Sequence, residues 1–257
     1  PALGWGDSGD VVTVLQNRLN ELGYRTADEA GYYGDGTWSA VMALQKFEGL
    51  DRTGTMDGPS WVRLYTPTGW MPPSRPAVGI EVEVDLDRQV LIVLNAERPQ
   101  QVTILNTSTG GEYTYYNKDG SEDYAWTPPG RYEGYRRYDG VEEAPLGTLY
   151  RPIYFYRGWA VHGSPSVPSY PASHGCVRLS NNDMDWLWDR APDDLAVTVR
   201  STMNPPLLAA EEAEWAAAAA QAAAEEQAAA QQAALETFEA GVDASRAAAG
   251  LEAYYSG

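Results

Sequence analysis

The sequence contains one cysteine, two histidines and two lysines among its 257 residues. A single cysteine excludes a disulfide bond within the chain. No run of about 18 bulky apolar residues occurs, so the sequence predicts no membrane-spanning helix. Basic residues are also scarce, because 18 Lys and Arg stand against 36 Asp and Glu and give a net charge of −18. This charge excludes general binding to the phosphates of nucleic acids.

Apolar and aromatic residues, in contrast, are abundant. Hydrophobic residues make up 44% of the chain, and the aromatics include 9 Trp and 17 Tyr. This composition is sufficient for a buried core and excludes a wholly disordered chain. The length is comfortable for two or three domains. The chain begins at Pro1 without a signal-peptide pattern, so we expect a mature or trimmed form.

Residues 1–67 have the spacing of a small helical domain. Leu15, Leu19 and Leu22 recur at helical intervals before Gly23, and a second apolar series follows from Trp38. A short third helix is predicted after Gly58, Pro59 and Ser60. Residues 68–78 are rich in proline and predict a stiff linker.

Residues 79–201 predict a β-rich domain. Apolar and acidic residues alternate over 80–87, which predicts a half-buried strand, and the apolar run 90–94 predicts its hairpin partner. Further strands are predicted at 102–104, 153–156 and 159–161. Residues 182–189 predict one short helix.

Residues 202–257 are dominated by Ala, Glu and Gln. Asn204 and Pro205 suit the start of a helix, and glutamates follow in the first turns, where the helix dipole favours acids. We therefore predict a long C-terminal Ala-rich helix that acts as a solvated spacer. A coiled coil that binds a partner is the alternative, but no heptad of large apolar residues supports it.

The residues with the strongest chemistry lie close together. Both histidines, His162 and His174, fall within 15 residues that also contain Cys176. An imidazole that accepts the thiol proton turns cysteine into a nucleophile, and Gly175 leaves backbone N–H groups open to a developing oxyanion. A buried structural cysteine and a zinc site with three protein ligands are the alternatives that these residue types leave open.

The segment His162-Gly163, followed by nine residues and then Ser173-His-Gly-Cys-Val-Arg-Leu179, resembles the signature of the YkuD-type L,D-transpeptidases. The turns at 107–110, 127–130 and 145–147 resemble other motifs of that family. The spacer is short, and Arg178 stands where many members have Asn. The resemblance covers about residues 79–201.

This resemblance implies roles for individual residues. Cys176 is expected to be the nucleophile and His162 its base, with the carbonyl group of Gly163 orienting the imidazole ring. His174 is expected to shape the acyl pocket and the oxyanion region. The expected substrate-binding residues are Ser173, Gly175 and Arg178.

The first domain shows a second, independent resemblance. Gly6-Asp-Ser-Gly9, Leu15-Gln16, Leu22-Gly-Tyr24 and Leu44-Gln45 occur in the order that is seen in three-helix peptidoglycan-binding domains. A helical bundle without a ligand is the alternative.

The combined expectation is a multidomain α+β protein. It comprises a peptidoglycan-binding three-helix domain (1–67), a linker (68–78), a YkuD-like sandwich domain (79–201) and a helical tail (202–257). The resemblance implies a cysteine acyltransferase that forms 3–3 cross-links between peptidoglycan stem peptides and releases D-Ala. It also implies an extracytoplasmic, secreted location and no metal or organic cofactor. A hydrolase with the same nucleophile and a non-catalytic wall-binding protein are the alternatives.

Overall fold

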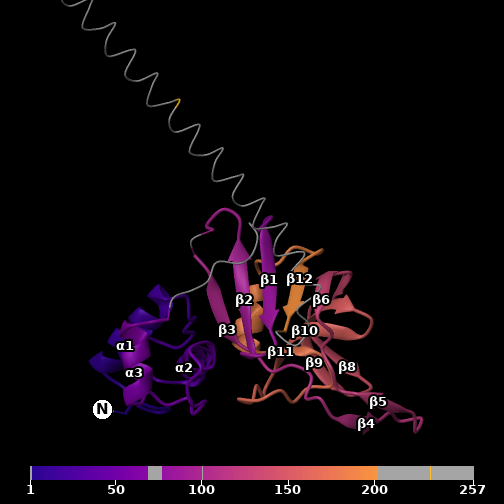
Figure 1. The fold of residues 1–257 in the computed structure, drawn as a ribbon, viewed down its shortest axis with the longest axis horizontal. Coiled ribbons are helices and arrows are strands. Elements are labelled where there is room, and N and C mark those ends of the chain that lie inside the picture. Colours follow the sequence, from indigo (N-terminus) through magenta and orange to yellow (C-terminus); the bar gives the residue numbers. More distant parts are fainter. Residues whose placement is uncertain (1, 69–76, 100, 202–231, 233–257) are drawn as a thin grey trace, which may run out of the picture. The chain divides into compact units, whose positions relative to one another are not determined.

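The computed structural model describes residues 2–68, 77–99, 101–201 and 232 (Figure 1). Apart from Gln232, the predicted helical tail (202–257) lies outside the described residues, as does most of the predicted linker. Within the described ranges, no helix has both the length and the apolarity that crossing a membrane requires.

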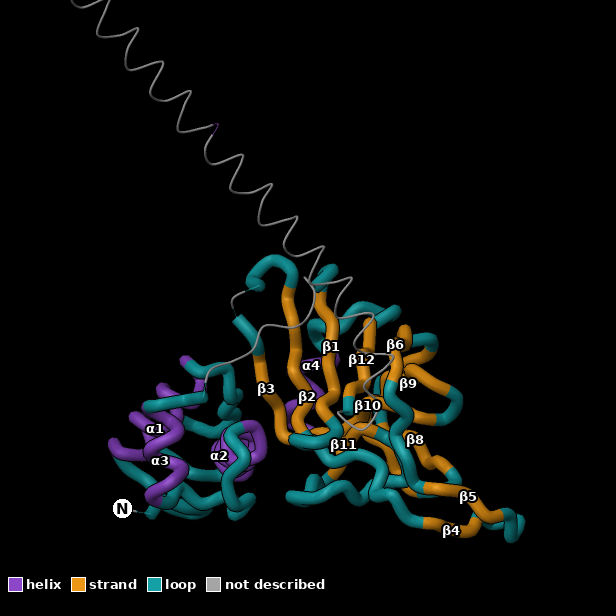
Figure 2. Tube along the Cα trace, viewed as in Figure 1, coloured by secondary structure: helices purple, strands orange, loops and turns teal. Residues whose placement is uncertain are grey.

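Three helices form the N-terminal part of the chain, as the sequence predicts (Figure 2). They are α1 (Asp10–Glu21), α2 (Asp35–Phe47) and α3 (Gly58–Tyr65). The Asp57 side chain accepts a hydrogen bond from the Ser60 N–H and caps α3, whose first turn contains Pro59. We refer to residues 2–68 as the helical domain.

The strands of the chain's described residues form two main sheets and one small hairpin. The first sheet has the order β3-β2-β1-β12-β6, with β1 parallel to β12 and the other neighbours antiparallel. Its strands are β1 (Ile80–Asp85), β2 (Val90–Asn95), β3 (Thr103–Asn106), β6 (Gly130–Glu133) and β12 (Ala196–Arg200). The hairpin that the sequence predicts from the 80–94 pattern is confirmed as β1–β2.

The second sheet has the order β11-β10-β9-β7, and β8 also pairs with β9. Its strands are β7 (Arg136–Arg137), β8 (Val141–Ala144), β9 (Gly147–Tyr156), β10 (Trp159–Ser164) and β11 (Val177–Ser180). A separate hairpin comprises β4 (Thr114–Tyr116) and β5 (Glu122–Tyr124). The predicted short helix is confirmed as α4 (Asn181–Trp188).

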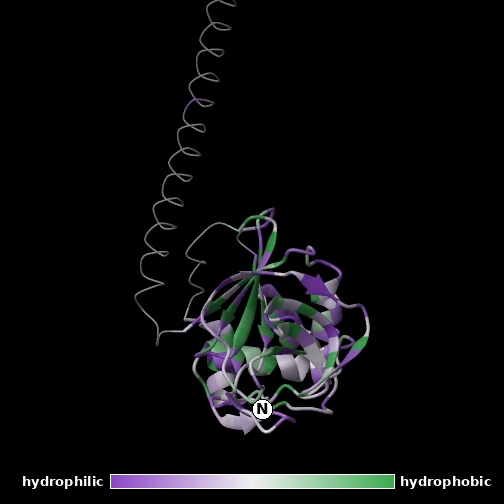
Figure 3. Cartoon of the chain, turned by 90° about the vertical axis from the view of Figure 1, so that its right-hand side faces the viewer, coloured by the Kyte–Doolittle hydropathy of each residue, from purple (hydrophilic) through white to green (hydrophobic). Residues whose placement is uncertain are grey.

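The main core lies between these two sheets and is closed by α4. Apolar side chains from both sheets form one buried cluster, and the apolar strands are visible inside the molecule in Figure 3. Met184 and Leu187 of α4 are fully buried in this cluster, and Trp188 packs against it. We refer to residues 77–201 as the β domain.

The prediction that the first strand is half-buried is wrong. Glu81 and Glu83, which the alternation assigns to a solvent-facing side, are each only 3% exposed. Their charges are matched on that side, because Glu83 forms an ion pair with Arg200, and Arg131 lies 3.9 Å from Glu81. Paired charges can be buried where an unpaired carboxylate cannot, so both faces of β1 are covered.

The outer face of β2 and β3 shares a hydrophobic cluster with the helical domain. This cluster joins apolar side chains of the three helices to those of the sheet, namely Val90, Ile92, Leu94 and Ile104. A backbone hydrogen bond of 2.8 Å from the Ile104 N–H to the Gly23 carbonyl extends the contact. The two domains therefore exclude water together along this face.

A buried lysine of α2 also links the two domains. Lys46 is 1% exposed, and its Nζ donates to Asn106 Oδ1 and to the Thr107 carbonyl, both at 2.6 Å. Burial, and secondarily the charge of Arg52, lowers the pKa of Lys46 to about 7. The hydrogen bonds offset the cost of placing this amine in the interior.

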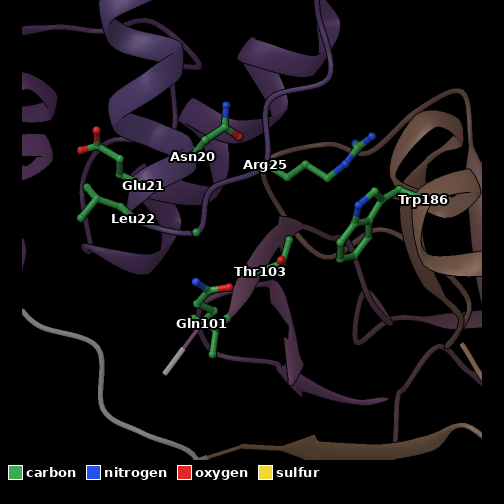
Figure 4. Close-up of a pocket in the computed structure, with 9 residues that line it drawn as sticks. Asn20, Glu21, Leu22, Arg25, Gln101, Thr103 and Trp186 are labelled. Carbon is green, nitrogen blue, oxygen red and sulfur yellow. The ribbon is translucent and has the colours of Figure 1, made fainter. Parts of the chain in front are cut away.

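A cavity of about 540 Å³ lies at the junction, between the end of α1 and the region of β3 and α4 (Figure 4). In this view the Arg25 side chain extends toward Trp186 of α4. The Arg25 guanidinium lies 5.6 Å from the centroid of the Trp186 ring and 2.6 Å from the Asp183 carboxylate. Asp183 is buried, so this ion pair is shielded from water and screened less than a surface pair.

We predict that Lys46→Met lowers the free energy of unfolding by about 1–3 kcal/mol, because it leaves buried acceptors of the β domain without a donor. Lys118→Met is the matched control, since Lys118 is the other lysine of the chain and is exposed. Urea unfolding of both variants measures the difference. Equal unfolding midpoints for the two variants would show that Lys46 does not stabilise the junction.

Candidate active site

The pairing of β10 with β11 brings His162 and Cys176 to the same side of the sheet. The two strands are parallel, with Val161 opposite Val177, and both valines are buried in the main core. Side chains alternate along a strand, so His162 and Cys176, each one position from a core valine, point to the opposite face.

That face forms the floor of a cavity of about 900 Å³. His162, His174 and Cys176 line it together with Arg178 and Ser173, so the structure brings these predicted residues into one site. Aromatic residues that the sequence analysis did not single out also line it, namely Tyr115, Trp126, Tyr156 and Trp159. The abundance of Trp and Tyr was their only signal in the sequence.

The His162 ring is held in one orientation by its own strand. Its Nδ1 lies 2.8 Å from the Gly163 carbonyl oxygen, and the residue is 5% exposed. A carbonyl only accepts, so Nδ1 carries the proton and Nε2 is the basic nitrogen of the neutral ring. Burial lowers the pKa of His162 to about 4, against the opposing effect of the Gly163 hydrogen bond.

Burial favours the protonated form of the Cys176 thiol. It raises the pKa of the thiol, while a hydrogen bond from the Ala160 backbone and the charge of Arg178 oppose that rise. Burial also lowers the pKa of His162, so both shifts favour a neutral thiol beside a neutral imidazole. A thiol beside a neutral imidazole can transfer its proton during nucleophilic attack.

A bend at Gly175 presents the cysteine. Gly175 has a φ of +137°, and a Cβ atom there would lie 2.4 Å from Trp159 Nε1 and 2.8 Å from the Trp126 carbonyl oxygen. Only glycine fits this backbone conformation and this space. The segment is therefore bent, and not extended, immediately before Cys176.

Ser173 stabilises this bend from inside. Its Oγ accepts the Gly175 N–H at 3.0 Å and donates to the Cys176 carbonyl at 2.6 Å. On the other side, Thr127 Oγ1 donates to the Gly175 carbonyl at 2.8 Å. The Gly175 N–H is thus engaged within the bend, which leaves the Cys176 N–H as the backbone candidate for an oxyanion donor.

The turn at residues 107–110 is bonded directly to the segment that contains Cys176. The Thr109 carbonyl accepts the N–H groups of Ala172 and Ser173, both at 2.9 Å, and Ser108 exchanges backbone hydrogen bonds with Arg178. The segment that leads to Ser173 also contacts the helical domain, because Arg52 Nη1 donates to the Ser169 carbonyl at 2.9 Å. The bend is therefore supported from both domains.

His174 lies at the side of the cavity. Its ring packs edge-on against Tyr115 at 4.6 Å and Tyr113 at 5.8 Å between centroids. Burial, and secondarily the charge of Arg178, lowers the pKa of His174. Within the described ranges, no group of three or more His, Cys, Asp or Glu side chains is arranged to hold a metal ion.

We predict that Gly175→Ala slows acylation of Cys176 by about tenfold or more, since the added methyl group meets backbone and indole atoms and the positive φ is strained. Gly58→Ala is the control, because a Cβ at Gly58 meets no atom within 4 Å. Intact-mass kinetics with a reactive β-lactam measure the rate. Wild-type acylation in Gly175→Ala would refute the need for glycine.

Comparison with known proteins assigns both domains. The L,D-transpeptidase catalytic domain model, YkuD, matches residues 79–199, and a putative peptidoglycan binding domain model matches residues 8–64. The chain is similar to an L,D-transpeptidase from Xylanimonas cellulosilytica, with 40% identity over 77% of this chain and 96% of that chain, at a TM-score of 0.71. A second similar structure, an L,D-transpeptidase from Stackebrandtia nassauensis, has 21% identity over 79% and 95% of the chains and a TM-score of 0.44. The chain therefore belongs to the L,D-transpeptidase family and carries a peptidoglycan-binding domain before its catalytic domain.

Proposed function

We propose that the chain is a cysteine-dependent L,D-transpeptidase that forms 3–3 cross-links between peptidoglycan stem peptides. The placement of the oriented base His162 on β10 and of Cys176 directly before the parallel strand β11, where both side chains line one large cavity, carries this proposal. No metal or organic cofactor is required, because the thiol and imidazole supply both the nucleophile and the proton acceptor.

In the first half-reaction, Sγ of Cys176 attacks the carbonyl carbon of the diamino acid at stem position 3 while His162 Nε2 accepts the thiol proton. The peptide C–N bond then breaks, and His162 returns the proton to the amine of the departing D-Ala. The products are a thioester and free D-Ala. The Cys176 N–H faces the oxyanion, and His174, packed against Tyr115, shapes the acyl pocket and the oxyanion region.

In the second half-reaction, an amine of a neighbouring stem attacks the thioester carbonyl. His162 accepts a proton from that amine and restores the Cys176 thiol as the C–S bond breaks. Arg178 lines the cavity as a cation, and we assign it to a substrate carboxylate. Ser173 and Gly175 position the nucleophile through the bend, and Ser173 also lines the cavity, where it can contact the substrate.

The substrate and the helical domain together imply an extracytoplasmic location. Peptidoglycan lies outside the cytoplasmic membrane, and we propose that the protein works there as a secreted or periplasmic enzyme. Donor and acceptor stem peptides are its partners. The net charge of −18 gives no general attraction to an anionic wall, so binding depends on specific contacts.

We predict that the wild-type protein converts tetrapeptide-stem muropeptides to cross-linked dimers and D-Ala, and that Cys176→Ala lowers this turnover by a factor on the order of 10⁴ or more. Mass spectrometry of the products measures both. Tripeptide monomers in place of dimers would identify a hydrolase with the same nucleophile. Turnover that persists in Cys176→Ala would contradict the assignment of the nucleophile.

The pH dependence distinguishes the two histidines. The wild-type base stays neutral above about pH 4, so acylation by a carbapenem is expected to change little between pH 6 and 8. In His162→Ala the reaction depends on spontaneous thiolate, whose pKa burial raises, so the rate is expected to be very low at pH 7 and to increase about tenfold per pH unit toward pH 9.

His174→Ala is the matched control for that experiment. It is expected to acylate more slowly at every pH, because it loses the ring that packs against Tyr115, without acquiring the steep pH dependence. The measurement is the rate of adduct formation by intact-mass spectrometry. A steep rise with pH in His174→Ala alone would reverse the two assignments.

A further inference from the structure

A third cavity, of about 670 Å³, adjoins the active-site cavity and is lined by residues of both domains. Trp5, Tyr32 and Trp38 line it from the helical domain. Ser164 and Pro165 line both this cavity and the cavity that contains Cys176, so the two share a wall. The mechanism described above uses none of its aromatic residues.

Two aromatic side chains that line this cavity are exposed to solvent. Trp5 is 63% exposed and Tyr32 is 43% exposed. The Trp5 indole is fixed by its Nε1–H, which donates to Asp35 Oδ1 at 2.8 Å. Large exposed aromatic rings with a fixed orientation are typical of binding surfaces, because they offer apolar area at a low entropic cost.

The opposite wall offers a neutral polar group. Asn181, the first residue of α4, is exposed and lines the cavity. No hydrogen bond among the described residues engages its side-chain amide, which can both donate and accept. The cavity therefore combines apolar rings with an unengaged amide.

The charges of the lining disfavour an anionic ligand. Its described lining residues include no Lys, Arg or His. Its carboxylates are already engaged, because Asp35 holds Trp5, and Asp28 accepts the N–H groups of Gly34, Gly36 and Thr37 at the start of α2. The N-terminus of α2 is thus capped by the chain itself, and carboxylate-bearing peptide is a poor match for this cavity.

We propose that this cavity binds the glycan chain of peptidoglycan, as a neutral N-acetylated saccharide that stacks on Trp5 and Tyr32 and hydrogen-bonds to Asn181. Sugar rings present apolar C–H faces to aromatic rings and hydroxyl and acetamido groups to amides. The inference rests on the proposed function, since stem peptides are attached to that glycan. A saccharide in this cavity presents its stem across Ser164 and Pro165 to Cys176.

The test is calorimetric titration of the full chain, carrying Cys176→Ala to prevent turnover, with N-acetylated chitotetraose and, separately, with free stem tetrapeptide. The double variant Trp5→Ala, Tyr32→Ala is expected to weaken saccharide binding by about tenfold or more. Asn181→Ala is expected to weaken it less. Tyr65→Ala is the control, because Tyr65 is 56% exposed and lies on α3 outside the cavity lining.

The proposal is overturned if the parent chain does not bind the saccharide at millimolar concentration, or if Tyr65→Ala weakens binding as much as the double variant. It is also overturned if the double variant binds the tetrapeptide more weakly while its affinity for the saccharide is unchanged. Thermal melting of each variant checks that it is folded. Muropeptide turnover by the wild type tests the proposed function separately: its absence, with saccharide binding intact, refutes the transpeptidase reaction and leaves the glycan site standing.

Discussion

The parallel pairing of β10 with β11 is the constraint on which the site depends. Val161 and Val177 lie opposite each other and are buried in the main core. Since side chains alternate along each strand, this register sends His162 and Cys176 together to the cavity face. A slip of one residue in either strand would direct its functional side chain into the core. The burial of the two valines thus directs His162 and Cys176 to the same cavity.

The helical domain packs against the β domain and donates hydrogen bonds to it. Its apolar side chains cover the outer face of β2 and β3, and Lys46 and Arg52 donate to carbonyl groups of the catalytic domain. One of these carbonyls, that of Ser169, lies on the segment that leads into the bend at Gly175. The helical domain therefore also supports the segment that leads to Cys176.

Much of this arrangement could be predicted from the sequence. The periodicity of the first domain predicts its three helices, the acidic–apolar alternation predicts the β1–β2 hairpin, and the cluster of His162, His174 and Cys176 predicts the site. The burial of Glu81 could not be predicted, because its partner Arg131 lies 50 residues away and comes near only when β6 joins the sheet. Local patterns report periodicity, whereas charge pairing across strands depends on topology.

Two features of the site also could not be predicted from the sequence. Whether the segment before Cys176 is extended or bent depends on Gly175, whose φ is set by contacts with Trp126 and Trp159 that no local pattern records. Spacing alone also could not show that the Gly175 N–H is engaged by Ser173. The roles of these residues follow from the closed hydrogen-bond pattern of the bend, which exists only in the folded chain.

The protonation state of His162 and Cys176 decides how the thiol is activated. Burial lowers the pKa of His162 to about 4 and raises that of Cys176, so a neutral imidazole faces a thiol at pH 7. The chain has only two histidines, which makes their NMR signals assignable with a single His174 variant. A ¹⁵N titration of the imidazole nitrogens measures the state directly. We expect a His162 ring that is neutral from pH 8 to pH 5, with its proton on Nδ1. A His162 ring that is protonated at pH 7 beside a thiolate would contradict this protonation state.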